Sequence, residues 1–544
     1  MKIDKHILLA SLLGVLIGLL LGGIFVVIPS RQKKFDGDYN RWRKLNLILY
    51  EVEQNYVDTI DRKAMTDAAV AAALQELDPH SIYMPPVELE KSETELQGNF
   101  DGIGIQFNVP NDTATVISII PGGPSEKAGL LPGDRLISVD DRSIAGRKTP
   151  QDSMVSLMRG PAGSKVRIMV KRGSETIPFD ITRGKIPVHC IDVAYMLNDT
   201  TGYIKLTKFT KTTYKEFKEA TDKLSALGMK KLIFDLRDNS GGFLDQAYLL
   251  CNEFLEVGKN VVYMEGRKRS RSELDADGRG SLQNLPLVVL INEGSASSSE
   301  IFAGAIQDND RGVLVGRRSF GKGLVQEPII FTDGSGIRLT VARFYTPSGR
   351  CIQKPYSDDY AYDIYERYAH GEMTDVDSIK VNKDEVYHTM GGRTVYGGGG
   401  IIPDVFVAMD TTKATTFYMN CTKKATPMRF ASAVFDKYSS QLGSISSMPQ
   451  LKNWFSSVAL ERQFLDYASR VDGLTVSPNE WAECQQYMMA QVYALVGRYS
   501  KLGEEAFYVL YQDLDNVLQT AISTDPVPFV PLSIAAASGP VQTL

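Results

Sequence analysis

A cluster of serines and one lysine in the middle of the sequence could together carry out nucleophilic chemistry. The segment GSASSSE contains Ser297 and follows the apolar run 285–292, and Lys322 lies further along, in GRRSFGKG (316–323). A serine where a strand passes into a helix presents its hydroxyl at the end of a sheet. The helix N-terminus there offers N–H groups to a developing oxyanion. Serines at such places also serve as plain helix caps, and this segment alone favours that simpler interpretation.

A serine nucleophile needs a base, and Lys322 is the candidate. The chain has 5 histidines, none in a suggestive pattern, which leaves a serine–lysine pair as the alternative. Lysine accepts a proton only when neutral, so its pKa must fall from about 10.4, mainly through desolvation. Gly321 and Gly323 let the backbone pass closely on both sides. Gln326 lies at an even offset, which in a strand places its amide on the same face as the lysine.

The same lysine segment comes close to a phosphate-binding loop. Gly316, Gly321 and Lys322 fit that pattern, but Gly323 stands where the hydroxyl residue that binds magnesium belongs. The residues after the lysine, GLVQEP, indicate a strand, whereas a phosphate-binding loop opens a helix. We therefore expect no nucleotide binding.

A glycine turn supplies a second set of backbone N–H groups. The apolar run 231–237 ends in the segment that contains Asn239, Gly241 and Gly242. Exposed amides in such a turn can stabilise an oxyanion. Taken alone, a plain tight turn explains this segment equally well.

Composition excludes several classes of function. There are 60 lysines and arginines against 65 aspartates and glutamates, giving a net charge of −5, which offers no electrostatic basis for nucleic-acid binding. The 5 cysteines form no Cys-x-x-Cys pair and the histidines lack ligand spacing. The sequence therefore predicts neither a metal site nor a disulfide framework, and no cofactor.

The elements that must position these residues change character along the chain. Residues 7–28 are uncharged and apolar, long enough as a helix to span about 30 Å of hydrocarbon. They lack a signal-peptide cleavage site, so we predict an uncleaved anchor within residues 1–30.

Four further regions follow the predicted anchor. Residues 31–97 are mostly helical, and residues 98–184 are short strands punctuated by glycine. Residues 185–410 alternate apolar strands with helices, which predicts an α/β core with both sheet faces covered. Residues 411–544 repeat apolar side chains at three- and four-residue steps, as amphipathic helices do.

Several separated motifs together resemble one family. DLRDNSGG, GSASSSE, GRRSFGKGLVQ and GGGGIIPD, in this order, are similar to the C-terminal-processing (tail-specific) serine proteases of bacteria and plastids, and LDPHSIY and GIGI agree. The resemblance covers roughly residues 45–410. It implies an α/β crotonase-like protease core with an inserted PDZ domain, a helical N-terminal region and an all-α C-terminal extension.

The resemblance assigns roles to the residues of the site. It implies that Ser297 is the nucleophile, Lys322 the general base, and Gln326 the residue that orients the lysine. The backbone N–H groups implied to form the oxyanion hole are those of Ser298, Gly241 and Gly242. One departure is Ser298, which stands where the family commonly has alanine.

The resemblance also places a peptide-binding groove in residues 98–184. Successive amides of its loop would hold a free α-carboxylate while the following strand pairs with the peptide by β-addition. The loop residues are Gly102, Ile103, Gly104 and Ile105. A helix would line the pocket for the terminal side chain with Met154, Leu157 and Met158, since flexible methionines suit a tolerant apolar pocket.

The prediction is a membrane-anchored, extracytoplasmic serine endopeptidase. It places the chain as single-pass in a bacterial inner membrane, with the catalytic part in the periplasm. Its PDZ domain would capture protein substrates with exposed apolar C-terminal tails, and a Ser–Lys dyad would cleave them without metal, nucleotide or other cofactor. The alternative is a catalytically silent, membrane-anchored PDZ scaffold. A homodimer or an adaptor protein stays open as a further partner.

Overall fold

The computed structural model describes residues 43–109, 112–356 and 360–526. The chain divides into two compact units, Met1–Ala73 and Leu74–Leu544. The first unit contains α2 (Arg43–Asn55) and most of α3 (Arg62–Gln75). The predicted anchor segment, residues 7–28, lies outside the described residues.

The described helices do not include one that could cross a membrane. Among them α15 (Pro478–Gly497) reaches 20 residues, but polar positions such as Glu480, Glu483 and Gln486 interrupt its apolar surface. The predicted localisation, single-pass in a bacterial inner membrane with the catalytic part in the periplasm, is contradicted by this finding and is not retained.

A six-stranded sheet forms the centre of the second unit. Its order is β10 (Ile191–Met196), β11 (Thr201–Leu206), β12 (Lys231–Asp235), β15 (Leu287–Ile291), β16 (Val313–Gly316) and β21 (Val405–Phe406). β10 is antiparallel to β11 and the other pairs are parallel. The apolar runs in the sequence therefore become buried strands, as their composition predicts.

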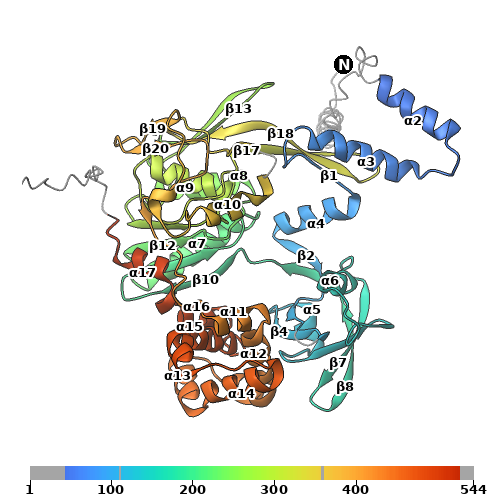
Figure 1. Ribbon diagram of the computed structural model, residues 1–544, viewed down its shortest axis with the longest axis vertical. Helices are drawn as coiled ribbons and strands as arrows, with labels where there is room; N and C mark the ends of the chain where they lie inside the picture. Colours follow the sequence, from blue (N-terminus) through green and yellow to red (C-terminus); the bar gives the residue numbers. More distant parts are fainter. Residues whose placement is uncertain (1–42, 110–111, 357–359, 527–544) are drawn as a thin grey trace, which may run out of the picture. The chain divides into compact units, whose positions relative to one another are not determined.

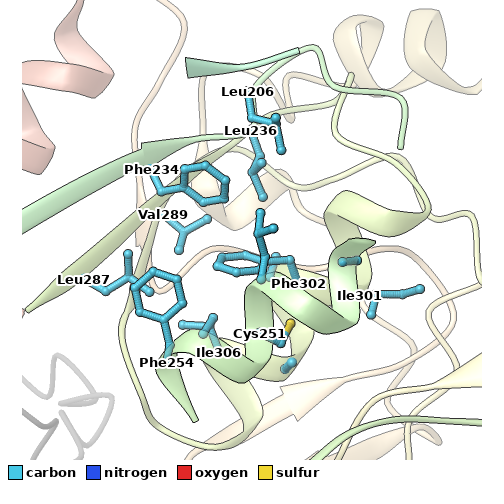
Figure 2. Packing of buried hydrophobic residues seen from close by; sticks show 14 of the residues in the cluster. Leu206, Phe234, Leu236, Cys251, Phe254, Leu287, Val289, Ile301, Phe302 and Ile306 are labelled. Carbon is cyan, nitrogen blue, oxygen red and sulfur yellow. The ribbon is translucent and has the colours of Figure 1, made fainter. Parts of the chain in front are cut away.

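Helices cover both faces of this sheet. On one face lie α7 (Thr213–Ala226), α8 (Leu244–Phe254) and α9 (Ser298–Asp308) (Figure 1). Their aromatic side chains pack against those of the strands. The Phe302 ring of α9 packs against Phe234 of β12 and Phe254 of α8, with ring centroids 5.1 and 5.8 Å away. Figure 2 shows these three side chains packed together. On the other face the alternate strand residues pack against α17 (Asn516–Ser523) near the end of the described chain.

A second sheet contains the strand that follows Lys322. Its members are β1 (Ile82–Met84), β13 (Asn260–Gly266), β14 (Arg269–Asp275), β17 (Leu324–Ile330) and β18 (Gly336–Tyr345). β18 pairs with β1, β13 and β17. The sheet thus places β1, which follows the segment around residue 80, and β17, which follows Lys322, on opposite sides of β18.

The glycine-rich region forms a separate antiparallel sheet with two short helices. Its elements are β3 (Ile105–Asn108), β4 (Thr115–Ile119), α5 (Pro124–Ala128), β5 (Arg135–Val139), β6 (Arg142–Ser143), α6 (Gln151–Met158), β7 (Lys165–Arg172) and β8 (Glu175–Thr182). β2 (Asn99–Gly102) pairs with β9 (Gly184–Pro187), so the chain enters and leaves this region at one place. The region is therefore an insertion, preceded by α4 (Pro86–Gln97).

The C-terminal part is helical. It contains α11 (Thr416–Lys423), α12 (Thr426–Leu442), α13 (Met448–Ser457), α14 (Leu460–Asp472), α15 and α16 (Glu504–Tyr511), which share one apolar core. Before it, residues after 360 form α10 (Asp363–Ala369) and the short pair β19 (Val386–His388) and β20 (Thr394–Tyr396). The amphipathic pattern of the sequence is thus satisfied by helix-on-helix packing.

Candidate active site

Ser297 occupies the N-cap of α9 in an unusual backbone conformation. Its φ is 55° and its ψ is −112°, a region that non-glycine residues rarely adopt. Such a conformation costs on the order of 1–3 kcal/mol and persists only where the surroundings hold it. The preceding turn is held by Ser295, whose hydroxyl donates to the Leu236 carbonyl at 2.8 Å. The strand-to-helix junction therefore presents Ser297 on a strained, firmly anchored turn.

A buried carboxylate joins the serine segment to the lysine segment. Glu300 is fully buried, and its Oε2 accepts the backbone N–H of Ser297 at 2.8 Å and that of Lys322 at 2.9 Å. Its Oε1 accepts from the Ser319 hydroxyl at 2.5 Å and the Gly321 N–H at 2.7 Å. Burial raises the pKa of Glu300, and these four hydrogen bonds oppose that rise.

Sequence reasoning did not single out Glu300. The signal available was an acidic residue three positions after the N-cap, the spacing of a capping box. Its side chain does accept the N–H of Ser297, as such a box requires. Its hydrogen bonds to residues 319–322 could not be foreseen, because they depend on where the later loop lies.

Lys322 is half-buried, just before β17. Burial lowers the pKa of its amine, and the positive charge of Arg338 lowers it further, while Glu300 and Asp78 act in the opposite direction. The environment therefore favours the neutral amine that a general base needs. Since Lys322 is followed by strand β17 and not by a helix, the segment does not have the strand–loop–helix geometry of a phosphate-binding loop.

The serine hydroxyl and the lysine amine are not joined by a direct hydrogen bond within the described residues; the Glu300 carboxylate links their backbones. Catalytic hydrogen bonds often tighten only when substrate is bound. The hydrogen bond that the Gln326 side chain donates is not to the lysine: its Nε2 donates to the His80 carbonyl at 2.7 Å. A β-bulge between Val325 and Gln326 breaks the even spacing that predicted a shared face with the lysine. The role of Gln326 toward Lys322 stays a prediction.

The segment around residue 80 forms one wall beside Lys322. The Asp78 carboxylate accepts from the backbone N–H of His80 and from both the N–H and the hydroxyl of Ser81. His80 shares a 2.7 Å hydrogen bond with the Tyr360 hydroxyl. Burial and the charge of Lys322 lower the pKa of His80 to about 4. His80 is therefore neutral at ordinary pH, and the motif LDPHSIY positions a wall of the site.

The glycine turn packs directly against Ser297. Gly241 has φ 98°, and a Cβ added to it would lie 2.8 Å from Ser297 Cβ and 2.9 Å from the Ser298 nitrogen. The Gly241 N–H donates to Asn239 Oδ1 at 2.9 Å, so it is engaged within the turn. The N–H of Ser298, at the first position of α9, belongs to the class of helix-start amides without an intrahelical acceptor. The turn and the helix start therefore meet, while the oxyanion roles of Ser298, Gly241 and Gly242 stay predictions.

The two serines after Ser297 join α9 to this turn through hydrogen bonds. The Ser298 hydroxyl donates to the Gly242 carbonyl at 2.9 Å, and the Ser299 hydroxyl donates to the Asn239 carbonyl at 2.8 Å. Serine at position 298, where alanine was expected from the resemblance, therefore adds a hydrogen bond between the two halves of the site.

The inserted domain contains a groove of about 180 Å³ between β3 and α6. Its lining comprises Phe100, Gly102, Ile103, Gly104, Ile105, Phe107, Val155, Met158 and Arg159. The predicted loop and Met158 thus lie together. Met154 and Leu157 are not among the lining residues, and Met154 is fully buried in the domain core. The groove uses the helix face of Val155, Met158 and Arg159, which are three and four positions apart.

The sequence patterns did not predict two aromatic residues and an arginine of this groove. Phe100 precedes the loop on β2, and the guanidinium of Arg159 lies 4.7 Å from the centre of its ring. Phe107 lies on β3. Only the pairing of β2 with β9 and the position of α6 bring these side chains to one groove.

Comparison with known proteins identifies both parts of the chain. The model of peptidase family S41 matches residues 200–362, and the PDZ domain model matches residues 102–182. The chain is 34% identical over 325 residues to the carboxy-terminal processing protease CtpA of Bacillus subtilis, covering 59% of this chain and 69% of that protein. It is 35% identical over 320 residues to the carboxy-terminal-processing protease of Bartonella bacilliformis, covering 58% and 73%.

A solved structure, the photosystem II D1 C-terminal processing protease, is 27% identical, with a TM-score of 0.36 over 68% of this chain and 86% of that chain. The assignment rests on the sequence relatives. The matched regions make up more than two thirds of each relative's length, and both family models agree with this assignment. The chain therefore belongs to the carboxy-terminal processing proteases of peptidase family S41, and it carries the PDZ domain of that family.

Proposed function

We propose that this protein is a serine endopeptidase that cleaves substrates with exposed apolar C-terminal tails, using Ser297 as nucleophile and Lys322 as general base. The observation that supports the pair best is Glu300, whose carboxylate accepts the backbone N–H groups of both residues. One buried group thereby fixes the distance between the two segments. Membership of the family supplies the peptidase activity itself.

The proposed reaction proceeds through an acyl-enzyme. The Ser297 hydroxyl oxygen attacks the scissile carbonyl carbon while neutral Lys322 Nζ takes its proton. Backbone N–H groups at Ser298 and at the turn of Gly241 and Gly242 stabilise the oxyanion. The Lys322 ammonium then protonates the leaving amine. The neutral Lys322 amine then deprotonates a water molecule, which attacks the acyl-enzyme carbonyl and releases the acyl group from Ser297.

Gln326 would act on the lysine through its amide oxygen. Its Nε2 donates to the His80 carbonyl, and Oε1 is the atom that would accept from the lysine amine. An uncharged amide orients the amine without raising its pKa, as a carboxylate would.

The PDZ groove would select the tails. The loop of Gly102 to Ile105 offers successive backbone N–H groups to a terminal carboxylate, and the peptide adds as a strand along β3. The apolar terminal side chain would enter the groove of about 180 Å³ beside Met158. Arg159 gives the same groove a positive charge that complements a carboxylate.

The domain plan accompanies this proposal. We infer a PDZ domain at 98–184, a crotonase-like protease core at 185–410 and a helical region at 411–544, after a helical region at 31–97. The antiparallel pairing of β2 with β9 supports the PDZ boundaries, because it closes the insertion. A homodimer or an adaptor protein stays a prediction.

The test uses the purified full chain and two versions of one unstructured peptide. One version ends in a free apolar carboxylate and the other in an amide, and mass spectrometry follows cleavage. Cleavage of the free acid, weaker for the amide and absent in Ser297→Ala and Lys322→Met, supports the proposal. Equal cleavage of both peptides would remove tail recognition. Binding without cleavage would leave a PDZ scaffold instead of an enzyme.

A further inference from the structure

The C-terminal helix α17 is fastened to both ends of the central strand β12. At the start of the strand, Lys231 Nζ donates to the carbonyls of Ala521, Ile522 and Thr524 at 2.9, 3.0 and 2.6 Å. These are helix-end carbonyls, which lack intrahelical partners and favour a positive charge. Just beyond the other end of the strand, Arg237 pairs with Asp515, the N-cap of α17. The helix therefore lies antiparallel to the strand, held at both termini.

The pair of Arg237 and Asp515 is bidentate. Arg237 Nη1 donates to Asp515 Oδ1 at 2.9 Å and Nη2 donates to Oδ2 at 2.7 Å. Both side chains are 16% exposed, so solvent screens this pair less than a surface ion pair. A planar guanidinium bound by two parallel hydrogen bonds is fixed in orientation as well as in position.

The other edge of the same guanidinium is held by Asp235 at the end of β12. Arg237 Nε and Nη2 donate to the Asp235 carboxylate at 3.0 and 2.6 Å, and Tyr203 donates to it at 2.7 Å. Lys205 Nζ reaches the same carboxylate at 3.3 Å and also donates to the backbone carbonyl of Arg237. The carboxylates of Asp235 and Asp515 thus both bind the Arg237 guanidinium, and Lys205 also binds the backbone carbonyl of Arg237.

Arg237 is the last residue before the glycine turn of the site. Asp238 follows with φ 59°, and Asn239 then donates from its side chain to the Leu206 carbonyl and accepts the Gly241 N–H. On its far side the turn is bound by the serines of α9. Asp515 is therefore connected to the start of α9 through Arg237 and the short turn that follows it.

We propose that Asp515 is a positioning residue for the peptidase reaction: by clamping Arg237 it sets the turn of Gly241 and Gly242 against Ser297. The inference rests on the proposed function and deepens it, because it gives the C-terminal region a part in catalysis. Asp515 does not touch the reacting atoms. It acts through Arg237, and its effect belongs to the chemical step and not to capture of the tail by the PDZ groove.

The test is Asp515→Asn in the full chain. Asparagine caps helices about as well as aspartate, so α17 keeps its N-cap while Arg237 loses a bidentate carboxylate. We expect kcat to fall about tenfold, because small displacements of catalytic groups cost that much or more. KM and the affinity for a free-acid tail peptide should stay within twofold of the parent values.

Two matched controls separate positioning from docking of the helix. Asp513→Asn makes the same change of charge two residues away, at an exposed position that is not among the hydrogen-bond partners of Arg237 in the described structure. Lys231→Met removes the three hydrogen bonds at the opposite end of α17. Both should keep kcat within twofold of the parent, even where Lys231→Met lowers the midpoint of thermal unfolding.

The outcomes are distinct. A kcat for Asp515→Asn within twofold of the parent overturns the inference, and so does a parallel loss of kcat and thermal midpoint in Asp515→Asn and Lys231→Met. Should Asp515→Asn not fold, Asp515→Ser keeps a capping hydroxyl that cannot reach Arg237, and the same loss of kcat is expected. If Ser297→Ala cleaves as well as the parent, the proposed function itself fails, whatever the Asp515 variants show.

Discussion

At the scale of single residues, the site depends on a buried acid that does no chemistry itself. Glu300 accepts four hydrogen bonds from two segments, one at Ser297 and one at residues 319–322, and is fully buried. A buried carboxylate is stable only when its oxygens are satisfied in this way. Its value to the site is geometric, because it couples the backbones of Ser297 and Lys322.

Glu300→Gln should therefore damage both activity and stability. An amide has one oxygen and an NH2 group, so the NH2 would face N–H donors that now point at a carboxylate. We expect kcat to fall at least about tenfold and the free energy of unfolding to fall by about 2 kcal/mol. Peptide cleavage and urea unfolding measure the two effects. Glu293→Gln, which removes the partner of Arg317 nearby, is the control and should keep kcat; equal behaviour of the two variants would contradict the role of Glu300.

The pH dependence of cleavage should report on Lys322. If Lys322 is the base, as proposed, it works only when deprotonated, so kcat/KM rises with pH and is lost as pH falls through the pKa of the amine. Burial and Arg338 hold that pKa below its usual value. Arg338→Gln removes a positive charge, so the acid limb of the profile should move to higher pH, by about half a unit. An acid limb near pH 4 that does not move in Arg338→Gln would instead indicate that His80 is the titrating group.

At the scale of elements, the glycine turn and the start of α9 must approach more closely than side chains allow. A Cβ on Gly241 would meet Ser297 Cβ at 2.8 Å, and its φ of 98° disfavours any other residue. Gly241→Ala should abolish measurable cleavage and cost roughly 1–3 kcal/mol of stability.

Gly228→Ala supplies the matched control. Gly228 has a similar φ of 95°, but a Cβ there would meet only the Asp199 carbonyl, at 3.9 Å. We expect a cost of about 1–2 kcal/mol from the backbone alone, with cleavage retained. If both alanine variants cleave equally well, close packing of the turn on Ser297 is not required.

Helix α6 places Met154 in the PDZ core and Met158 where the core meets the groove. Both side chains belong to the buried core, at 0% and 4% exposure, and Met158 also lines the groove. Met154→Ala should cost about 2–5 kcal/mol of stability and leave the preference for a free-acid tail unchanged at temperatures where the domain is folded. Met158→Ala should weaken binding of an apolar tail, measured by fluorescence anisotropy, and should also cost stability, because its side chain is 4% exposed. The reverse pattern would place the tail on the other face of α6.

At the scale of the whole molecule, the helical C-terminal region completes the protease core. Val517, Leu518 and Ala521 of α17 pack against alternate residues of the central sheet, including Ile233 and Leu290. Together with Tyr508 and Val509 of α16, this helix covers the second face of the central sheet, a face that must be buried in a largely parallel sheet. The C-terminal region is therefore joined to the core through both apolar packing and the pairs at Lys231 and Arg237.

Leu518→Ala should consequently destabilise the protease core and not only the last helix. The side chain is 2% exposed, so its truncation should cost about 2–5 kcal/mol. Urea unfolding followed by both overall helicity and loss of cleavage should show one shared shift of midpoint. A shift in helicity with cleavage unchanged would mean that the core folds independently of α17.

Local patterns of apolar and capping residues in the sequence predicted much of the fold. Apolar runs at 231–237 and 285–292 predicted β12 and β15, and the serine segment predicted the start of α9, because burial and capping depend on neighbouring residues. The motifs also led to the family, which the relatives confirm. The localisation failed because it rested on the hydropathy of a single run, residues 7–28.

Tertiary structure alone decided which distant residues meet. Glu300 reaches residues 319–322, Gln326 turns to His80 because a bulge intervenes, and Met154 points into a core instead of a groove. Asp515 meets Arg237 across 278 positions of the chain. Spacing along the sequence determines which face of an element a side chain occupies, but only the packing of elements determines what that face touches.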